Sequence, residues 1–155
     1  MIDIHTHILP GLDDGAANGD DSLRMARAAA AEGITAVIAT PHHANGSYVN
    51  PAADIAERTH RLNDRLAEVG IPLTVYPGQE IRVHDDLLDA WDRKELLTLA
   101  GSGYMLIELP FTHIPKSTDE LLHELCVLGL KPIIAHPERN AEIVKHPRRL
   151  AGWIE

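Results

Sequence analysis

The chain has 155 residues and a formal net charge of −9, and both facts limit what it can be. The length suits a single domain, which we expect to cover residues 1–155. An acidic balance without any run of Lys and Arg argues against nucleic acid as a partner, because phosphate backbones are bound by clustered basic residues. The sequence has no secretory signal and no apolar stretch near the roughly 20 residues of a membrane span. We therefore expect a cytoplasmic protein without membrane insertion.

Short apolar runs alternate with helical segments along the chain. Predicted strands lie at residues 2–4, 34–40, 73–76, 104–109 and 131–135. Predicted helices lie at residues 22–32, 51–69, 85–94 and 118–128, and Pro147 opens a further one. The expected helix caps are Asp20 or Asp21 for the first helix, Asn50 for the second and a Ser117–Glu120 capping box for the fourth. This alternation predicts an α/β fold whose parallel strands form a sheet or a barrel.

Residues that can bind metal follow the predicted strands. His5 and His7 follow the first strand, His42 and His43 the second, Glu80 the third and His136 the fifth, while Glu108 ends the fourth. A histidine after one strand is usually an ordinary polar residue. Because the carboxyl ends of parallel strands meet at one edge, however, ligand-type residues after all five strands predict a metal site.

The residue types indicate which chemistry the site would support. Positions i and i+2 of a strand face the same way, so His5 and His7 can share an ion. Imidazole together with carboxylate suits manganese, iron, zinc or cobalt. A carboxylate such as Glu80 can bridge two ions, and two or three ions about 3.5–4 Å apart favour displacement at phosphorus.

Two loops next to these ligands add further candidates. Asp13 and Asp14 lie in a Pro/Gly turn, where Asp13 is expected to serve the turn and Asp14 is either a turn residue or a ligand. Arg139 lies three residues beyond His136, where its guanidinium could bind a phosphate group through two hydrogen bonds. The single cysteine, Cys126, lies in an apolar helical stretch and is expected to be buried.

Five motifs occur in order over residues 3–140 and carry a family resemblance. They are DIHTHILPGLDDGA, IATPHH, PGQEIR, IELPF and AHPERN. Together they resemble the PHP (polymerase and histidinol phosphatase) superfamily, and within it the bacterial manganese-dependent protein-tyrosine phosphatases of capsular and exopolysaccharide operons. The resemblance implies a distorted (β/α)7 barrel, of which this chain would hold the first five βα units. It also implies a centre of two or three Mn²⁺ ions, with iron or zinc as alternatives.

The resemblance further implies a role for each candidate residue. His5 and His7 would bind a first ion, Glu80 would be shared with a second, Glu108 and His136 would complete the second, and Asp14 and His42 would help to hold a third. Arg139 would bind the substrate phosphate while a metal-activated hydroxide attacks phosphorus. The implied substrate is phosphotyrosine on an autophosphorylated bacterial tyrosine kinase, whose dephosphorylation regulates capsule or exopolysaccharide synthesis.

The chain departs from the family pattern at its end. The family carries a late Asp-x-His motif that supplies two further ligands, and no such motif follows His136. We therefore expect a C-terminally truncated chain that alone binds metal weakly and hydrolyses p-nitrophenyl phosphate slowly. The alternative functions are a phosphatase for a small phosphomonoester such as histidinol phosphate, a nuclease, which the negative charge disfavours, and an inactive PHP scaffold fragment.

Overall fold

The computed structural model describes residues 1–154, over which seven parallel strands form two sheets. The strands are β1 (Ile2–Thr6), β2 (Ala36–Ala39), β3 (His42–His43), β4 (Thr74–Pro77), β5 (Glu80–Arg82), β6 (Tyr104–Glu108) and β7 (Lys131–Ile134). One sheet has the order β1-β2-β4 and the other β3-β5-β6-β7. The strands thus follow one another in chain order, as they do in the wall of a barrel.

The sheet divides because the second and third predicted strands are each followed, after a break, by a short strand that the sequence pattern did not predict. β2 ends before Pro41, which has no N–H group to donate to a strand ladder, and the chain pairs again as β3. β4 ends before Gly78, whose backbone packs against the side chain of Ile38 so closely that an added Cβ would lie 2.8 Å from Ile38 Cγ2. As a result, His42 and Glu80, predicted to follow strands, instead open the short strands β3 and β5.

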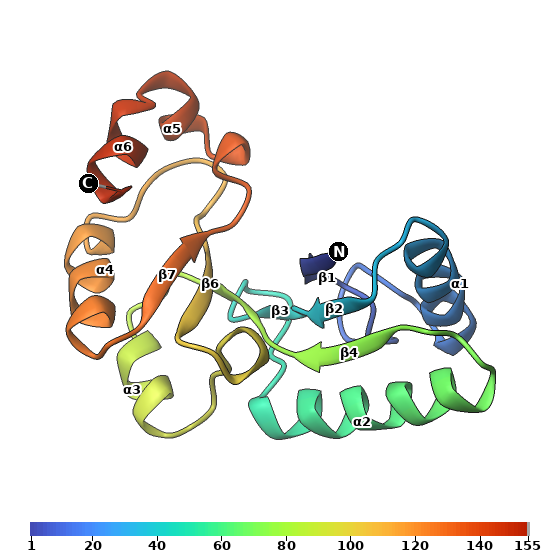
Figure 1. Ribbon diagram of the computed structural model, residues 1–155. Coiled ribbons are helices and arrows are strands. Elements are labelled where there is room, and N and C mark those ends of the chain that lie inside the picture. Colours follow the sequence, from blue (N-terminus) through green and yellow to red (C-terminus); the bar gives the residue numbers. More distant parts are fainter. Residues whose placement is uncertain (155) are drawn as a thin grey trace.

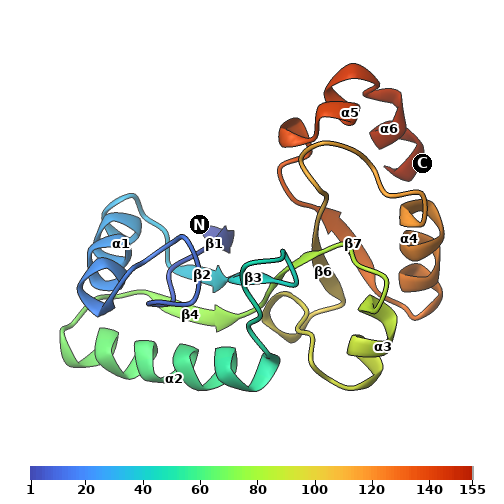
Figure 2. The same ribbon diagram turned by 180° about the vertical axis from the view of Figure 1, so that it is seen from behind.

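The helices are α1 (Gly19–Ala31), α2 (Ala52–Glu68), α3 (Leu87–Asp92), α4 (Thr118–Val127), α5 (Ala141–Lys145) and α6 (Arg148–Ile154). Short 3-10 turns lie at Leu99–Gly101 and Pro137–Arg139. In Figure 1, α1 and α2 flank β1, β2 and β4, while α3 and α4 flank β6 and β7. Figure 2 shows the same two groups from behind. The predicted α/β class is therefore confirmed, and α5 is the helix that the sequence pattern missed.

Alternation along the strands gives the two faces of each sheet different partners. On β2, Val37 and Ala39 belong to the core beneath α1 and α2, whereas Ile38 packs on the opposite face with Leu106 of β6. A second core beneath α3 and α4 includes Ile81, Leu87, Met105, Ile107, Leu121 and Leu125. The helices thus cover one face, and the opposite face carries Ile38 and Leu106 together with the polar groups described below.

The helix caps differ from those predicted. Asn18, not Asp20 or Asp21, caps α1, since its side chain accepts hydrogen bonds from the backbone N–H groups of those two aspartates. Ser117 precedes α4 without a side-chain cap hydrogen bond.

Asn50 does not cap α2 either. It is buried, and its Nδ2 donates hydrogen bonds to the carbonyl oxygens of Leu12 (3.1 Å) and His42 (2.7 Å). Its side chain therefore ties the loop after β1 to β3 instead of serving the helix.

Two further features concern the surface. Cys126 is exposed on α4, so the prediction that it is buried is wrong. Within residues 1–154, no helix combines the length and apolar character that crossing a bilayer requires.

Asn140 joins three segments, and its replacement tests the architecture. The side chain is 2% exposed, donates to the carbonyl oxygens of Pro110 (2.6 Å) and His113 (2.9 Å), and caps α5 through the N–H groups of Glu142 and Ile143. Asn140→Ala should lower the free energy of unfolding by about 2–4 kcal/mol, because it removes a cap and two part-buried hydrogen bonds to carbonyl groups. Urea denaturation followed by circular dichroism measures the change.

Asn18→Ala is the matched control. Asn18 makes the same two kinds of cap hydrogen bond but is exposed, so its loss should cost only about 1 kcal/mol. Equal losses in the two variants would contradict a bridging role for Asn140.

Candidate metal centre

The residues predicted as ligands converge although they are spread over the sequence from His5 to His136. Residues His5, His7, Asp14, Gly15, His42, Glu80, His136 and Arg139 line one cavity of about 390 Å³. Glu108 lies behind this cavity, with its Oε2 3.5 Å from His42 Nδ1. All seven predicted ligands and Arg139 therefore lie in one place, where β1, β6 and β7 end and the short strands β3 and β5 begin.

Glu80 forms the middle of the cluster. It is fully buried, and its Oε2 lies 3.1 Å from His5 Nε2 and 3.2 Å from His7 Nε2, while its Oε1 lies 2.6 Å from His136 Nε2. Burial alone would raise the pKa of Glu80, but the surrounding histidines outweigh it and hold that pKa far below its usual range. Glu80 is therefore a carboxylate, with both oxygens directed at imidazole nitrogens.

The strongest indication of a bound cation is that His42 and Glu108 each have a buried polar atom without a hydrogen-bond partner within residues 1–154. His42 Nδ1 is buried 3.3 Å from Glu80 Oε2, yet neither it nor the buried Glu108 Oε1 has a hydrogen bond of acceptable geometry among the described residues. Buried polar atoms nearly always have partners. Since His42, Glu80 and Glu108 each present a ligand atom within 4.8 Å of the others, a divalent cation would supply the missing partner.

Two more groups of three residues have the same spacing. They are His5, His7 and Glu80, and His7, Asp14 and His42. His7 Nε2 lies 3.3 Å from His5 Nε2, so the predicted H-x-H pair does face one point. His7 Nδ1, however, already contacts Asp13 Oδ2 at 2.6 Å, which leaves only Nε2 for an ion. A third ion would therefore depend on Asp14 and His42 more than on His7.

Asp13 does more than the turn role predicted for it. One carboxylate oxygen accepts from the N–H of Gly15, as a turn residue does, but the other contacts His7 Nδ1 and accepts from the N–H of His42 at 3.0 Å. A carboxylate on the far nitrogen fixes the tautomer and direction of a ligating histidine. Burial would lower the pKa of His7, yet the hydrogen bonds to Asp13 and Glu80 raise it to about 10. The carboxylates thus favour positive charge at this point.

The turn after β7 brings two functional side chains to the cavity. His136 has φ 27° and ψ 58°, a left-handed conformation that few residues other than glycine adopt. This conformation starts the 3-10 turn Pro137–Arg139, so that His136 contacts Glu80 while Arg139 lines the same cavity from the exposed side. Among residues 1–154, no carboxylate forms an ion pair with Arg139, whose guanidinium is free to bind an anion.

Sequence reasoning missed Arg82 and did not resolve His43. Arg82 Nε donates to Glu108 Oε2 at 2.8 Å, and its guanidinium lies over the Phe111 ring at 5.4 Å. His43, although adjacent to His42, is directed away and donates from Nδ1 to the carbonyl oxygen of Asn50 at 3.1 Å. Strand periodicity could have separated the two histidines, because neighbouring residues of a strand face opposite sides.

Gly15 packs directly against His7 and leaves no space for a side chain. An added Cβ would overlap the carbonyl oxygen and the Cβ of His7, while the N–H of Ala16 donates to that same carbonyl at 3.0 Å. Gly15→Ala should therefore displace His7 and weaken Mn²⁺ binding by at least about tenfold, as changes beside metal ligands commonly do. Isothermal titration calorimetry measures the affinity.

Gly19→Ala is the control for this substitution. Gly19 has an ordinary φ, and an added Cβ would meet no atom within 4 Å, so metal affinity should stay unchanged. If Gly15→Ala binds Mn²⁺ as tightly as Gly19→Ala does, the close packing on His7 does not position the ligand.

Comparison with known proteins agrees with this geometry. Tyrosine-protein phosphatase YwqE of Bacillus subtilis is 48% identical over 155 residues, which cover 100% of this chain and 61% of YwqE. Tyrosine-protein phosphatase CpsB of Streptococcus pneumoniae is 30% identical over 155 residues, which cover 100% of this chain and 64% of CpsB. The chain thus spans less than two thirds of the length of these relatives.

A solved chain gives the same relation in three dimensions. It comes from crystal structures of YwqE from Bacillus subtilis and CpsB from Streptococcus pneumoniae, described as unique metal-dependent tyrosine phosphatases. It is 48% identical to this chain with a TM-score of 0.96, and the match covers 99% of this chain and 62% of that one. A family model described as "Capsular polysaccharide synthesis, CpsB/CapC" matches residues 1–155. The chain therefore belongs to the CpsB/CapC family.

Proposed function

We propose that the protein carrying this chain is a metal-dependent phosphatase that hydrolyses phosphotyrosine in a protein substrate. The observation that carries the proposal is the convergence of four histidines and two carboxylates in one cavity, with Glu108 directly behind it and a free guanidinium, Arg139, at its exposed side. Relatives named as tyrosine-protein phosphatases support the same activity. The proposed substrate is a bacterial tyrosine kinase of capsule or exopolysaccharide synthesis, and a cytoplasmic location remains a prediction from the sequence.

The proposed cofactor is manganese, in two or three ions, with iron or zinc as alternatives. The proposed ligands are His5, His7, Asp14, His42, Glu80, Glu108 and His136. Hard or borderline divalent ions suit this set, which contains imidazole and carboxylate without thiolate. Bound cations of this kind would supply Lewis acidity to a phosphoryl group and a source of hydroxide at neutral pH.

The protein's own side chains have separate tasks in this proposal. Arg139 would bind two phosphate oxygens through its planar guanidinium and so orient the phosphoryl group. Asp13 holds His7 in one tautomer, and Arg82 holds Glu108 through its 2.8 Å hydrogen bond. Cys126 lies on the exposed side of α4 and lines none of this cavity, which leaves no role for it as a nucleophile.

Aromatic side chains beside the cavity favour an aryl phosphate. Tyr48 stacks on His42 with ring centroids 6.1 Å apart, and the half-exposed Phe111 lies 6.2 Å from the ring of His136. Both rings lie next to proposed ligands, where the phenyl ring of phosphotyrosine would have to lie. Phenolate, with a pKa of about 10 when unperturbed, also leaves more readily than an aliphatic alkoxide.

Replacement of Glu80 tests the metal-dependent activity. Glu80→Gln removes the charge that faces four histidines, so it should lower both the bound Mn²⁺ and the rate of phosphate release from a phosphotyrosine peptide, the rate by more than about 100-fold. Elemental analysis and a phosphate-release assay, with and without a chelator, measure the two quantities.

Glu138→Gln is the matched control, because Glu138 is exposed in the same region and lines no part of the cavity. It should keep both properties. Turnover by the parent protein that persists in the presence of the chelator would contradict the proposed activity. A parent protein that purifies without metal and binds none when metal is added would also contradict it, and would favour a scaffold.

Replacement of Phe111 tests the preference for aryl phosphates. Phe111→Ala should lower kcat/KM for the phosphotyrosine peptide by roughly three- to tenfold, the value of one aromatic contact. It should leave hydrolysis of β-glycerophosphate nearly unchanged, and Phe111→Trp should retain the preference. Equal losses on both substrates would instead mean that Phe111 acts through Arg82 and Glu108.

A further inference from the structure

A second cavity, away from the metal centre, is lined by cationic side chains. It has a volume of about 330 Å³ and lies between α1, α2 and the loop after β1. Its lining residues are Pro10, Gly19, Asp20, Leu23, Arg58, Arg61, Leu62 and Arg65. We name it the arginine pocket. It contains three guanidinium groups and one carboxylate, in a chain whose net charge is −9.

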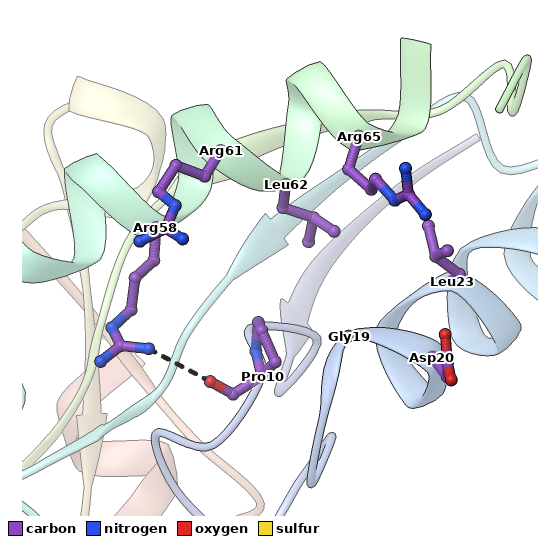
Figure 3. A pocket seen from close by; sticks show the side chains of 8 residues that line it. All are labelled: Pro10, Gly19, Asp20, Leu23, Arg58, Arg61, Leu62 and Arg65. Carbon is purple, nitrogen blue, oxygen red and sulfur yellow. Dashed lines mark hydrogen bonds between the residues drawn. The ribbon is translucent and has the colours of Figure 1, made fainter. Parts of the chain in front are cut away.

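The three arginines share one face of α2. Arg58, Arg61 and Arg65 are spaced i, i+3 and i+7, which places them in a row along about 10 Å of helix. Figure 3 shows Arg58 and Arg65 toward opposite ends of the pocket, with Leu62 between them and Leu23 of α1 on the facing wall. Leu23 and Leu62 are 7% and 6% exposed, so they form a recessed apolar floor.

All the contacts that these guanidinium groups make within the protein are exposed to solvent. Arg58 makes one long hydrogen bond, 3.4 Å, to the carbonyl oxygen of Pro10, and no carboxylate of residues 1–154 lies within ion-pair distance of it. Arg61 is 3.9 Å from Glu57 and Arg65 is 2.9 Å from Glu68, both on the exposed surface of the same helix. Exposed ion pairs of this kind contribute little to stability, so a ligand can replace them readily.

We propose that the arginine pocket docks an extended acidic segment of another protein. Along α2 the pocket presents Arg58, then Leu62, then Arg65, which is a cation, an apolar side chain and a second cation. This order complements a segment that carries an acidic, an apolar and a second acidic side chain on one face. In an extended chain such side chains recur at every second residue, so about five residues span the row. The charge complementarity is local, because the rest of the protein is acidic and repels the same segment.

Other anionic ligands fit this pocket less well. A single phosphate needs donors that converge on one point, whereas these arginines are spread along two turns of helix. A membrane surface calls for protruding apolar side chains, whereas Leu23 and Leu62 lie at the bottom of the pocket. An extended protein segment can place its carboxylates next to the arginines and an apolar side chain on Leu23 and Leu62.

A binding experiment with an unphosphorylated peptide tests the proposal separately from phosphatase activity. The probe is a fluorescein-labelled peptide containing Glu-Ser-Leu-Ser-Glu, and its fluorescence anisotropy reports binding at low salt. The proposal expects saturable binding that weakens by at least about tenfold in Arg58→Glu/Arg61→Glu, because each reversal turns an attraction into a repulsion. It also expects binding to fall when both Glu residues of the probe are Gln.

Arg27→Glu/Arg148→Glu is the matched control. It makes the same change in net charge at two exposed arginines that do not line the pocket, and it should bind the probe within about twofold of the parent protein. Circular dichroism confirms that both double variants are folded.

Several results would overturn the proposal. They are the absence of saturable binding, an equal loss of affinity in both double variants, and full displacement of the probe by millimolar inorganic phosphate, which would indicate a small-anion site. Binding to phosphatidylserine vesicles that depends on Arg58 and Arg61, without binding of the peptide, would indicate a membrane surface instead.

Discussion

The candidate centre depends on one carboxylate that water does not reach. Glu80 is 0% exposed, and an unpaired charge at such a position would cost several kcal/mol, on the order of the effective penalty for a buried ion. Its oxygens face His5 and His7 at the end of β1, His42 at the start of β3 and His136 after β7. The charge is compensated only if the carboxyl ends of β1 and β7 meet the first residues of β3 and β5. The arrangement of these strands therefore determines the chemistry of the cavity.

The interruptions in the sheet serve this requirement as well. β2 and β4 run beneath α1 and α2; β2 ends before Pro41, which lacks an N–H group, and β4 ends before Gly78, which packs closely against Ile38. The chain then pairs again as β3 and β5, with His42 in register with Glu80. His42 and Glu80 thus each lie three residues beyond the end of a strand that packs in the hydrophobic core, β2 for His42 and β4 for Glu80.

The change from an apolar strand to a ligand-type residue can be recognised in the sequence alone. An apolar run followed by a ligand-type residue identifies Glu80 without any structure. Asp13 could be predicted only in part, because its turn hydrogen bond is local whereas its contact with His7 depends on the path of the loop. Arg82 and Asn50 were missed or misassigned, since their partners lie 26 and 38 positions away in the chain. Asn50 has the local pattern of a helix cap, yet its amide instead donates to the carbonyl groups of Leu12 and His42.

The loop between β1 and α1 separates the two cavities, with Pro10 lining the arginine pocket and Asp13 holding the ligand His7. Hydrogen bonds fix this loop from several sides, from Ala16 N to His7 O, from Ser22 Oγ to Ile8 O and from Asn50 Nδ2 to Leu12 O. A loop held in this way is a rigid partition and not a hinge, so a segment docked on one side leaves the ligands on the other side in place. If that segment belonged to the proposed substrate, docking would stabilise the bound substrate and the transition state equally, which would lower KM without changing kcat. The protein is acidic, so most of its surface repels an acidic partner. A separate cationic contact would therefore contribute most to the binding of a substrate that is itself negatively charged.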